Sequence, residues 1–383
     1  MNFLKKSLIV MIILILTNLN INFILYTIYD YFFPKKADPN FIYIQYECST
    51  DDLCGGWADR IKGVMSSYAI SLLTDRRFLI KMTKNCDLKN ILEPNEINWD
   101  YEQVPKNITL KSKEIEIGWD FDYYDIFKKD ISLFTKLDYI NIIKTKAGIM
   151  FANSFNQNVN LKNKTEQLGY KQSEFHIAYQ FHKWYKKMFK LNSKIQMRYD
   201  NFLKRLKPNR DSKLICCQIR KGDPNQREQR DEFVEQNFWN FINQTFLISN
   251  NYSSNFKIFV TSDLEYVKLD AKDYFKNNEV IFNENSSLHI DQVLMSDNEC
   301  EKMENVLLDF HLMQNCDIGV VSHSGYGILS LWNRPDPFKD LYVYSKEFDY
   351  LDLKNAEDRN KFFSNFKNLK FIKYSKLGDI FFQ

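Results

Sequence analysis

The amino-acid sequence predicts an α/β fold with two domains. The chain has 383 residues, which is enough for two domains of about 100 to 200 residues each. Its residues are 44% hydrophobic and 16% aromatic, a composition that favours packed cores over disorder. Short apolar runs alternate with helical patterns, and this alternation is typical of parallel sheets covered by helices on both faces. We expect the first domain to span residues 41–205 and the second to span 206–383.

The N-terminus predicts one membrane-spanning helix before these domains. Residues 7–29 are mostly apolar and match the roughly 20 residues that a helix needs to cross a bilayer. Lys5 and Lys6 precede the span and no small-x-small cleavage site follows it, so a retained signal anchor fits better than a cleaved signal peptide. We expect a cytoplasmic tail at 1–6, a stem at 30–40, and a single-pass type II protein of the ER or Golgi membrane with its domains in the lumen.

The cysteines and glycosylation sequons agree with a secretory lumen. Cys48 and Cys54 are close enough in sequence to form a disulfide, and the chain has seven cysteines. These cysteines show no zinc-ligand spacing, and Cys216 and Cys217 lie in an apolar run where we expect them to be buried. Five sequons follow the predicted span, at Asn107, Asn163, Asn243, Asn251 and Asn285.

In the first domain the pattern predicts a strand, a helix and a second strand. Residues 41–46 and 77–82 are apolar runs typical of strands. Between them, apolar side chains over 57–73 recur with the helical period and predict a helix with one buried face. The remainder, 83–205, is rich in Lys, Asn and aromatic residues, and it carries a helical pattern over 174–199.

The second domain shows a longer alternation. Apolar runs predict strands at 214–219, 256–262, 279–282, 318–322 and 341–344. Helical patterns lie at 231–248, 264–276, 301–315 and 325–333. Ligands of parallel sheets bind beyond the carboxyl ends of the strands, so the residues that follow each strand are the ones expected to carry chemistry.

The first such segment precedes the predicted helix at 57–73. Gly55 and Gly56 would let backbone N–H groups and the helix N-terminus approach an anion, and Asp59 and Arg60 follow at the helix start, near the cleft. The same residues also fit a tight turn with a surface ion pair between Asp59 and Arg60.

The second segment follows the strand at 214–219. Arg220 and Lys221 place two cations ahead of a glycine and Asp223. A guanidinium can hold a pyrophosphate through two hydrogen bonds, and a cation beside a departing nucleotide diphosphate stabilises the transition state without a metal. Arg220 is therefore the leading catalytic candidate, with a solvated turn over 221–224 as the alternative interpretation.

The third segment follows the strand at 318–322. Ser322 and Ser324 supply hydroxyls, and Gly325 and Tyr326 begin the next predicted helix. Hydroxyls and backbone amides at a helix N-terminus form a phosphate cradle, although Ser324 also fits a plain helix cap.

Together these segments resemble the fucosyltransferases that use GDP-fucose, the superfamily of alpha-1,2, alpha-1,6 and protein O-fucosyltransferases. The resemblance spans residues 40–335. That family has a Gly-Gly-x-x-Asn-Arg-like loop after its first strand, which residues 55–60 match with Asp at the Asn position. Its most diagnostic motif, His-x-Arg-x-x-Asp, is matched by Gln218, Arg220 and Asp223, with Gln in place of the usual His.

Two further motifs of that family also have counterparts. Residues 259–263 resemble the second motif, a strand that ends in Thr-Asp or Ser-Asp, and residues 307–324 resemble the third, a helix, a strand and a serine-rich loop that holds the nucleotide. The order and spacing of the motifs match as well, which is more specific than any single match.

The resemblance implies a GT-B architecture, in which two Rossmann-like domains face a cleft. It also implies inversion at the sugar without a metal or other cofactor, GDP-fucose as the donor, and a glycan or glycoprotein as the acceptor. The implied catalytic residues are Arg220, Asp223 and Asp59, while the general base stays open among Glu47, Asp59 and Asp223. The residues that we expect to bind the donor are Gly55, Gly56, Arg60, Gln218, Lys221, Asp263, Ser322, Ser324, Gly325 and Tyr326. His289 is a further candidate, a lone loop histidine that could contact the donor, the acceptor or neither.

Other interpretations remain open at this point. Asp120 and Asp122 form an Asp-x-Asp pattern, which fits a metal-dependent glycosyltransferase. Gln218 and Asp59 depart from the family pattern, which fits a non-catalytic, membrane-tethered glycan- or nucleotide-binding protein with the same fold, and a structural ectodomain would bind no nucleotide. A net charge of +3, from 52 basic and 49 acidic residues, gives no reason to expect a nucleic-acid partner.

Overall fold

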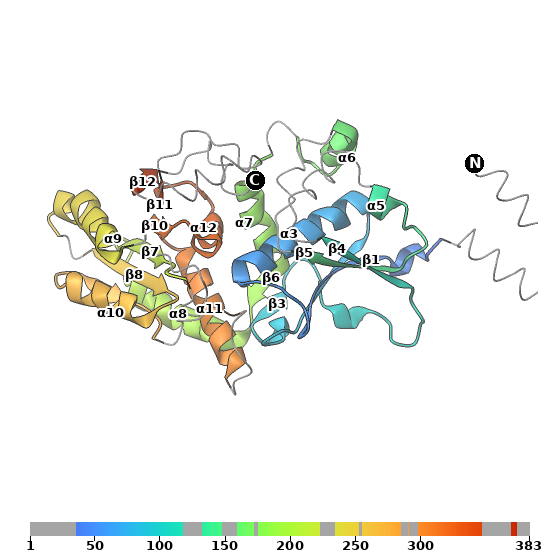
Figure 1. Cartoon of the computed structure of the whole chain (residues 1–383), viewed down its shortest axis with the longest axis horizontal. Helices are drawn as coiled ribbons and strands as arrows, with labels where there is room; N and C mark the ends of the chain where they lie inside the picture. The colour runs from blue at the N-terminus through green and yellow to red at the C-terminus, as the bar shows by residue number, and fades with distance from the viewer. Residues whose placement is uncertain are drawn as a thin grey trace, which may run out of the picture.

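The protein is an α/β structure with two main parallel sheets, one in each half of the chain. The computed structural model describes residues 36–117, 132–147, 159–171, 175–222, 234–252, 255–284, 290, 298–346 and 369–373. Figure 1 shows the two halves side by side along the long axis of the molecule. The α/β class predicted from the alternation of strands and helices is confirmed.

The first sheet has four parallel strands in the order β2-β1-β5-β4. The strands are β1 (Tyr43–Cys48), β2 (Arg77–Met82), β4 (Ser112–Ile117) and β5 (Ile142–Ala147). Helix α3 (Trp57–Thr74) packs on β1, β5 and β2 and buries most of its residues. The two predicted strands and the predicted helix of this half are confirmed, whereas β4 and β5 lie in 83–205, where no strand was predicted.

The second sheet has six strands in the order β12-β11-β10-β7-β8-β9, and only β12 runs antiparallel to its neighbour. Its strands are β7 (Lys213–Ile219), β8 (Phe256–Ser262), β9 (Glu279–Ile281), β10 (Ile318–Ser322), β11 (Leu341–Lys346) and β12 (Leu369–Lys373). Its helices are α9 (Glu235–Ile242), α10 (Glu265–Tyr274), α11 (Glu299–Met313) and α12 (Gly325–Trp332). All five strands predicted in this half are present.

The predicted helical pattern at 174–199 is two helices rather than one. Helix α7 (Ile177–Met188) ends where β6 (Phe189–Leu191) pairs with β3 (Leu92–Pro94), and α8 (Ser193–Leu206) then begins. The side chain of Asn192 accepts a hydrogen bond from Ile195 N at 2.9 Å and caps α8, which explains the new start.

Helix α8 packs against the second half of the molecule, although almost all of it lies before the predicted domain boundary at 205. Its Lys194 and Arg198 form ion pairs with the buried Glu304 on α11, at 2.6 and 3.3 Å. Helix α7 also contacts this half, since Tyr185 lies 2.9 Å from His311 on α11.

Short elements complete the described structure. They are α5 (Ser132–Thr135), α6 (Lys162–Gln167), the π-helix η8 (Asn243–Leu247), and the 3-10 turns η1 (Pro39–Phe41), η2 (Leu88–Asn90), η3 (Tyr101–Gln103), η6 (Val159–Leu161) and η9 (Ile248–Asn250). Within the helix predicted at 231–248, the described residues form α9, which continues as the π-helix η8 and then as the 3-10 turn η9.

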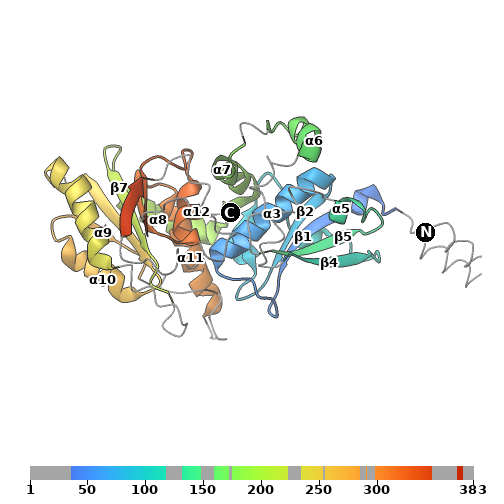
Figure 2. The ribbon, with the colours of Figure 1, turned by 45° about the horizontal axis from the view of Figure 1, so that its top comes forward.

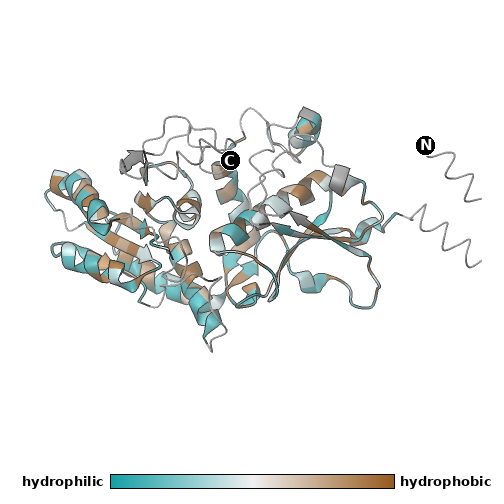
Figure 3. Cartoon of the chain, in the orientation of Figure 1, coloured by the Kyte–Doolittle hydropathy of each residue, from teal (hydrophilic) through white to brown (hydrophobic). Residues whose placement is uncertain are grey.

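Hydrophobic residues, coloured brown on the ribbon in Figure 3, are frequent on the strands and recur along the helices that cover them. One core cluster runs through both halves and includes the buried Trp99, Trp184 and Trp332. A second cluster around Trp239 and Phe238 fills the space between β7, β8 and α9. The shared cluster holds the two halves together, because separating them would expose apolar surface to water.

Three disulfides are present among the described residues. Cys48 pairs with Cys54, as their spacing predicts, and the other bonds are Cys86–Cys300 and Cys216–Cys316. Cys216 and Cys217 are buried as expected, and Cys217 carries a free thiol. The predicted anchor at 7–29 lies outside the described residues, and none of the described helices is long and apolar enough to cross a membrane.

Candidate functional site

A cavity of about 230 Å³ lies between the two sheets. Figures 1 and 2 both place the start of α3 beside α12, and this is where the cavity opens at the carboxyl ends of β7, β8 and β10. Its lining residues are Gly56, Trp57, Ala58, Asp59, Lys62, Gln218, Arg220, Thr261, Ser262, Asp263, Ile290, Val306, His323, Ser324, Gly325 and Tyr326. This is the edge of a parallel sheet at which ligands are expected.

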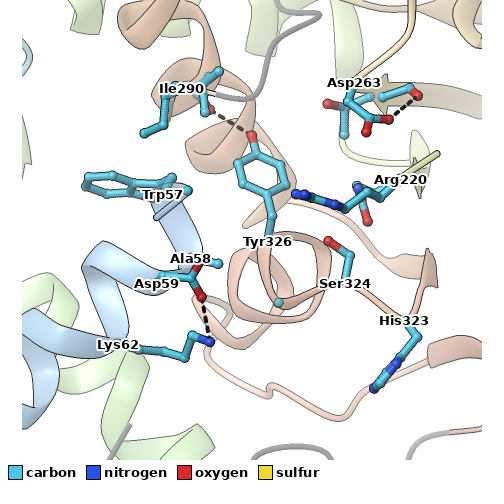
Figure 4. A pocket seen from close by; sticks show the side chains of 16 residues that line it. Trp57, Ala58, Asp59, Lys62, Arg220, Asp263, Ile290, His323, Ser324 and Tyr326 are labelled. Carbon is cyan, nitrogen blue, oxygen red and sulfur yellow. Dashed lines mark hydrogen bonds and ion pairs between the residues drawn. The ribbon is translucent and has the colours of Figure 1, made fainter. Parts of the chain in front are cut away.

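Arg220 directly follows β7 and points its guanidinium into the cavity toward Tyr326 (Figure 4). Its backbone N–H donates to Ser322 Oγ at 2.9 Å, and Ser322 Oγ donates in turn to Gln218 Oε1 at 3.4 Å. Its Nε is buried and has no hydrogen-bond partner among the described residues. A buried donor without a partner costs free energy, and a hydrogen bond to an acceptor atom of a ligand would recover that cost.

Asp263 fixes the turn that follows Arg220. Its two carboxylate oxygens accept hydrogen bonds from the backbone N–H groups of Lys221 and Gly222, both at 2.9 Å. Gly222 has a φ of 86°, a conformation that glycine adopts readily. The Lys221 side chain pairs with Glu235 at 3.2 Å and does not line the cavity.

Helix α12 begins at the cavity without a side-chain cap. Ser324 occupies the N-cap position but makes no side-chain capping bond, and the first N–H groups of a helix have no partner within it. Two glycines allow close approach at this point. A Cβ on Gly325 would lie 3.2 Å from Ala58 Cβ on α3, and a Cβ on Gly327 would lie 2.3 Å from Gln218 Oε1.

The opposite wall belongs to the first turns of α3. Asp59 and Lys62 lie one turn apart on the same helix face and form an ion pair at 2.8 Å, drawn in Figure 4. Between the walls, Tyr326 donates its hydroxyl to the backbone oxygen of Val306 at 2.7 Å. Burial raises the pKa of Tyr326 well above 10, with the nearby Asp309 adding to the effect, so the phenol stays neutral.

The structure brings most of the predicted site residues together. The predicted residues that line the cavity are Gly56, Asp59, Gln218, Arg220, Asp263, Ser324, Gly325 and Tyr326. Gly55, Lys221 and Ser322 do not line it, although Ser322 supports Arg220 from behind. Asp223 and His289 lie outside the described residues, as do Asp120 and Asp122. Within the described residues, no group of three or more His, Cys, Asp or Glu side chains is arranged to hold a metal ion.

Arg60 and Glu47 are placed differently from the prediction. Arg60 is fully buried and donates to the backbone oxygens of Gly55 and Lys84, both at 3.1 Å, instead of facing the cavity. Glu47 is buried between Lys81 and Lys144, at 2.7 and 3.1 Å, and also lies outside the cavity lining. Burial acts to raise the pKa of Glu47, but the hydrogen bonds from the two lysines outweigh it and the pKa is lowered. A carboxyl with a lowered pKa is a weaker base.

Several lining residues were not predicted. Lys62 follows Asp59 by three positions, and that helical spacing was a usable signal. Thr261 and Ser262 end a correctly predicted strand, and Trp57 and His323 each lie in a segment already singled out. The remaining lining residues that the prediction missed are Ala58, Ile290 and Val306.

The fold of this chain is similar to that of known proteins whose structures have been solved. No sequence-family model matches the chain, and no curated protein matches it. A mutant of Arabidopsis thaliana FUT1 in complex with GDP matches over 80% of this chain and 71% of its own, with a TM-score of 0.54 and 14% identity. Fucosyltransferase NodZ from Bradyrhizobium matches over 87% and 99%, at a TM-score of 0.48 and 11% identity. POFUT1 in complex with GDP-fucose matches over 78% and 96%, at a TM-score of 0.43 and 11% identity. The match to FUT1 shows that this chain has the same fold.

Proposed function

We propose that the chain is an inverting fucosyltransferase that moves fucose from GDP-fucose to a glycan or glycoprotein acceptor without a metal. The observation that carries the proposal is the buried Nε of Arg220, which lacks a partner among the described residues and faces the first turn of α12. Two kinds of N–H donor thus converge on one cavity, in a fold shared with a FUT1 structure that contains GDP. A diphosphate fits such a set of donors.

The proposed reaction uses these donors at the leaving group. As the bond between the sugar and the diphosphate breaks, negative charge develops on the departing phosphate oxygen. The backbone of Arg220 is fixed by Ser322, and its guanidinium and the N–H groups at the start of α12 both face the cavity, where they stabilise this charge. The acceptor hydroxyl attacks from the opposite face of the sugar, which inverts the configuration.

Asp59 is the carboxylate that we assign to the acceptor side. Both oxygens of Asp263 already accept backbone hydrogen bonds, so that residue is committed to shaping the turn after Arg220. Asp59 lines the cavity on α3, on the side opposite Arg220, and its carboxylate forms an ion pair with Lys62 at 2.8 Å. It can therefore receive the proton of the acceptor hydroxyl.

The location of the protein is also part of the proposal. We propose that residues 7–29 anchor the chain in the Golgi or ER membrane and that catalysis takes place in the lumen. Three disulfides support an oxidising compartment. The asparagines of three sequons, Asn107, Asn163 and Asn251, are exposed, which is compatible with glycans at these positions.

Donor binding tests the proposal most directly. Calorimetric titration of the full-length chain with GDP and with GDP-fucose, with and without EDTA, should show binding that EDTA does not change. Arg220→Ala should lose this binding. Arg210→Ala is the control and should retain it, because Arg210 is exposed and precedes the start of β7, at the end of the strand away from the cavity. Absence of binding to either ligand would reject the donor, and binding that EDTA abolishes would favour Asp120 and Asp122.

Turnover separates an enzyme from a binding protein with the same fold. GDP release from GDP-fucose should accelerate when a mixture of glycan and glycoprotein acceptors is added. Tight GDP binding without release in the presence of any acceptor would favour the non-catalytic alternative.

Gln218 stands where the resembled family has His, and it still contacts the site. It lines the cavity, and its Oε1 accepts a hydrogen bond from Ser322.

A further inference from the structure

A set of contacts joins the two halves of the molecule behind the cavity, and we call it the seam. It consists of Arg60, Asn85, Cys86, Glu299 and Cys300. Cys86 follows β2, Cys300 is in the first turn of α11, and the two form a disulfide across 214 residues. Beside this bond, Asn85 Nδ2 donates to Glu299 Oε2 at 3.1 Å. One covalent bond and one hydrogen bond therefore tie the loop after β2 to the start of α11.

The seam also holds the α3 wall of the cavity. The buried Arg60 donates through Nη2 to Asn85 Oδ1 at 2.8 Å and through Nη1 to Lys84 O at 3.1 Å. Its Nε donates to Gly55 O at 3.1 Å, in the turn that leads into α3. Asn85 thus receives a hydrogen bond from the α3 side and donates one to α11. The position of the α3 start depends on the same loop that the disulfide attaches to the second half.

Helix α11 carries the seam to the other side of the cavity. Val306 lies six residues after Cys300, or about 9 Å along the helix axis. It lines the cavity and accepts the hydrogen bond of Tyr326 at 2.7 Å. Because a helix moves as a stiff unit, a shift of its first turn moves Val306 and Tyr326 relative to the α3 wall.

We propose that the Cys86–Cys300 disulfide sets the spacing of the two cavity walls, so that its reduction weakens binding of the nucleoside diphosphate. Arg60 acts in this arrangement as a positioning residue for the start of α3, not as a donor-binding residue. The inference rests on the proposed function, because it concerns the ligand of the same cavity.

The reduction requires a dithiol, which supplies two electrons and two protons. One thiolate of the dithiol attacks the sulfur of Cys300, and the sulfur of Cys86 leaves as a thiolate. The second thiol of the reagent then displaces Cys300, which gives two protein thiols and the oxidised cyclic reagent. Cys300 is partly exposed, whereas the other five disulfide cysteines are buried, so this bond is the one that a dithiol reaches first.

The test compares GDP binding by the full-length chain before and after mild treatment with dithiothreitol. Mass spectrometry of trapped thiols confirms that only Cys86 and Cys300 have been reduced. We expect GDP to bind about tenfold more weakly once the bond is open, because small displacements of binding groups are costly. The double variant Cys86→Ser/Cys300→Ser should show the same weakening, and dithiothreitol should then have no further effect.

Hydrogen exchange supplies a readout that does not need a nucleotide. Opening the bond should increase deuterium uptake in peptides covering 55–62 and 299–306, while peptides from β7 stay protected. An affinity for GDP that stays within twofold after the bond is opened would overturn the inference. If the intact chain binds no GDP, the proposed function fails instead, and unchanged exchange in the α3 and α11 peptides would then overturn the seam as a spacer as well.

Discussion

The two walls of the cavity differ in how their charges are compensated. On the α3 wall, Asp59 and Lys62 neutralise each other at 2.8 Å. On the opposite wall, the buried Nε of Arg220 has no partner among the described residues, and α12 adds the positive end of its dipole. Helix α3 also begins at the cavity without a side-chain cap, so the walls differ in their side-chain charge and not in their helix ends. Under the proposed function, the diphosphate lies against the wall that carries Arg220 and the acceptor lies against the α3 wall.

The walls also differ in their support. The second wall is fixed from within its own half, because Asp263 and Ser322 hold the backbone around Arg220. The α3 wall is held partly through the seam, and thus partly by the other half of the molecule. Under the two proposals made above, the second wall binds the diphosphate in the conformation described here, and the distance of the α3 wall from it depends on the seam.

The largest expected effect comes from removing the positive charge of Arg220 from the second wall. Arg220→Ala should lower kcat/KM about 10³-fold, or about 4 kcal/mol, because the developing charge on the leaving phosphate loses its cation. Steady-state kinetics with GDP-fucose measure this loss. Arg220→Lys should recover only part of it, because an ammonium lacks the planar pair of donors. Full activity in Arg220→Ala would show that the second wall does not bind the diphosphate in this way.

Helix α11 should make the stability of the folded protein depend on pH. His311 on α11 is buried against Tyr185 on α7, at 2.9 Å, and burial lowers its pKa from 6.5 to about 4. Since the unfolded chain binds a proton at higher pH than the folded chain, stability is fully present above pH 6.5 and falls toward pH 4. The loss should reach about 3 kcal/mol.

Denaturant unfolding between pH 7 and pH 4 measures this dependence. His311→Gln keeps a hydrogen-bonding side chain near Tyr185 and should remove this part of the slope, while carboxylates such as Glu47 keep theirs. Equal slopes in the variant and the native chain would contradict the assignment to His311.

Asp59→Asn tests the chemistry of the α3 wall. It should lower kcat about 10²-fold, because an amide cannot accept the acceptor's proton, and leave the affinity for GDP unchanged. Lys62→Met is the matched variant, since it removes the partner in the ion pair and keeps the carboxylate. The resembled family carries Asn at this position, so retained activity in Asp59→Asn would mean that the reaction needs no base at this residue.

Strands β7 to β11 of the second sheet could be predicted from the sequence, whereas β4 and β5 of the first sheet were not, and the difference has a physical reason. Strand β7 is buried over Leu214–Ile219, and every residue of this run except Gln218 is apolar, which is a clear strand signal. In β5, by contrast, the buried Ile143 and Thr145 alternate with Lys144 and Lys146, which pair with carboxylates on neighbouring elements. That alternation with a period of two is a strand signal, but a weaker one inside a segment rich in lysine.

For the site, the position of a residue was easier to predict than its role. Arg220 and Ser324 follow strands whose ends meet at one edge of the sheet, so topology alone brings them together. Val306 comes from the middle of a helix, and only tertiary packing places it in the cavity. Arg60 looks the same in sequence whether it binds a phosphate or the backbone oxygens of Gly55 and Lys84, and the structure shows the second.

The smallest predicted effect concerns the contact between the walls. A Cβ on Gly325 would lie 3.2 Å from Ala58 Cβ, so Gly325→Ala should push α12 and α3 apart by a few tenths of an ångström. GDP affinity should then fall about tenfold, or about 1.4 kcal/mol, because the contacts between the α3 wall and the nucleotide become longer.

A second substitution can restore the contact and so identify its cause. The pair Gly325→Ala/Ala58→Gly returns the lost space at the same point, and calorimetry should show most of the GDP affinity recovered. Ala58→Gly alone lies in the first turn of α3 and should cost up to about 1 kcal/mol of stability, which thermal unfolding measures separately. If the pair binds GDP no better than Gly325→Ala, the loss arises within α12, and the spacing of the walls is not what the nucleotide senses.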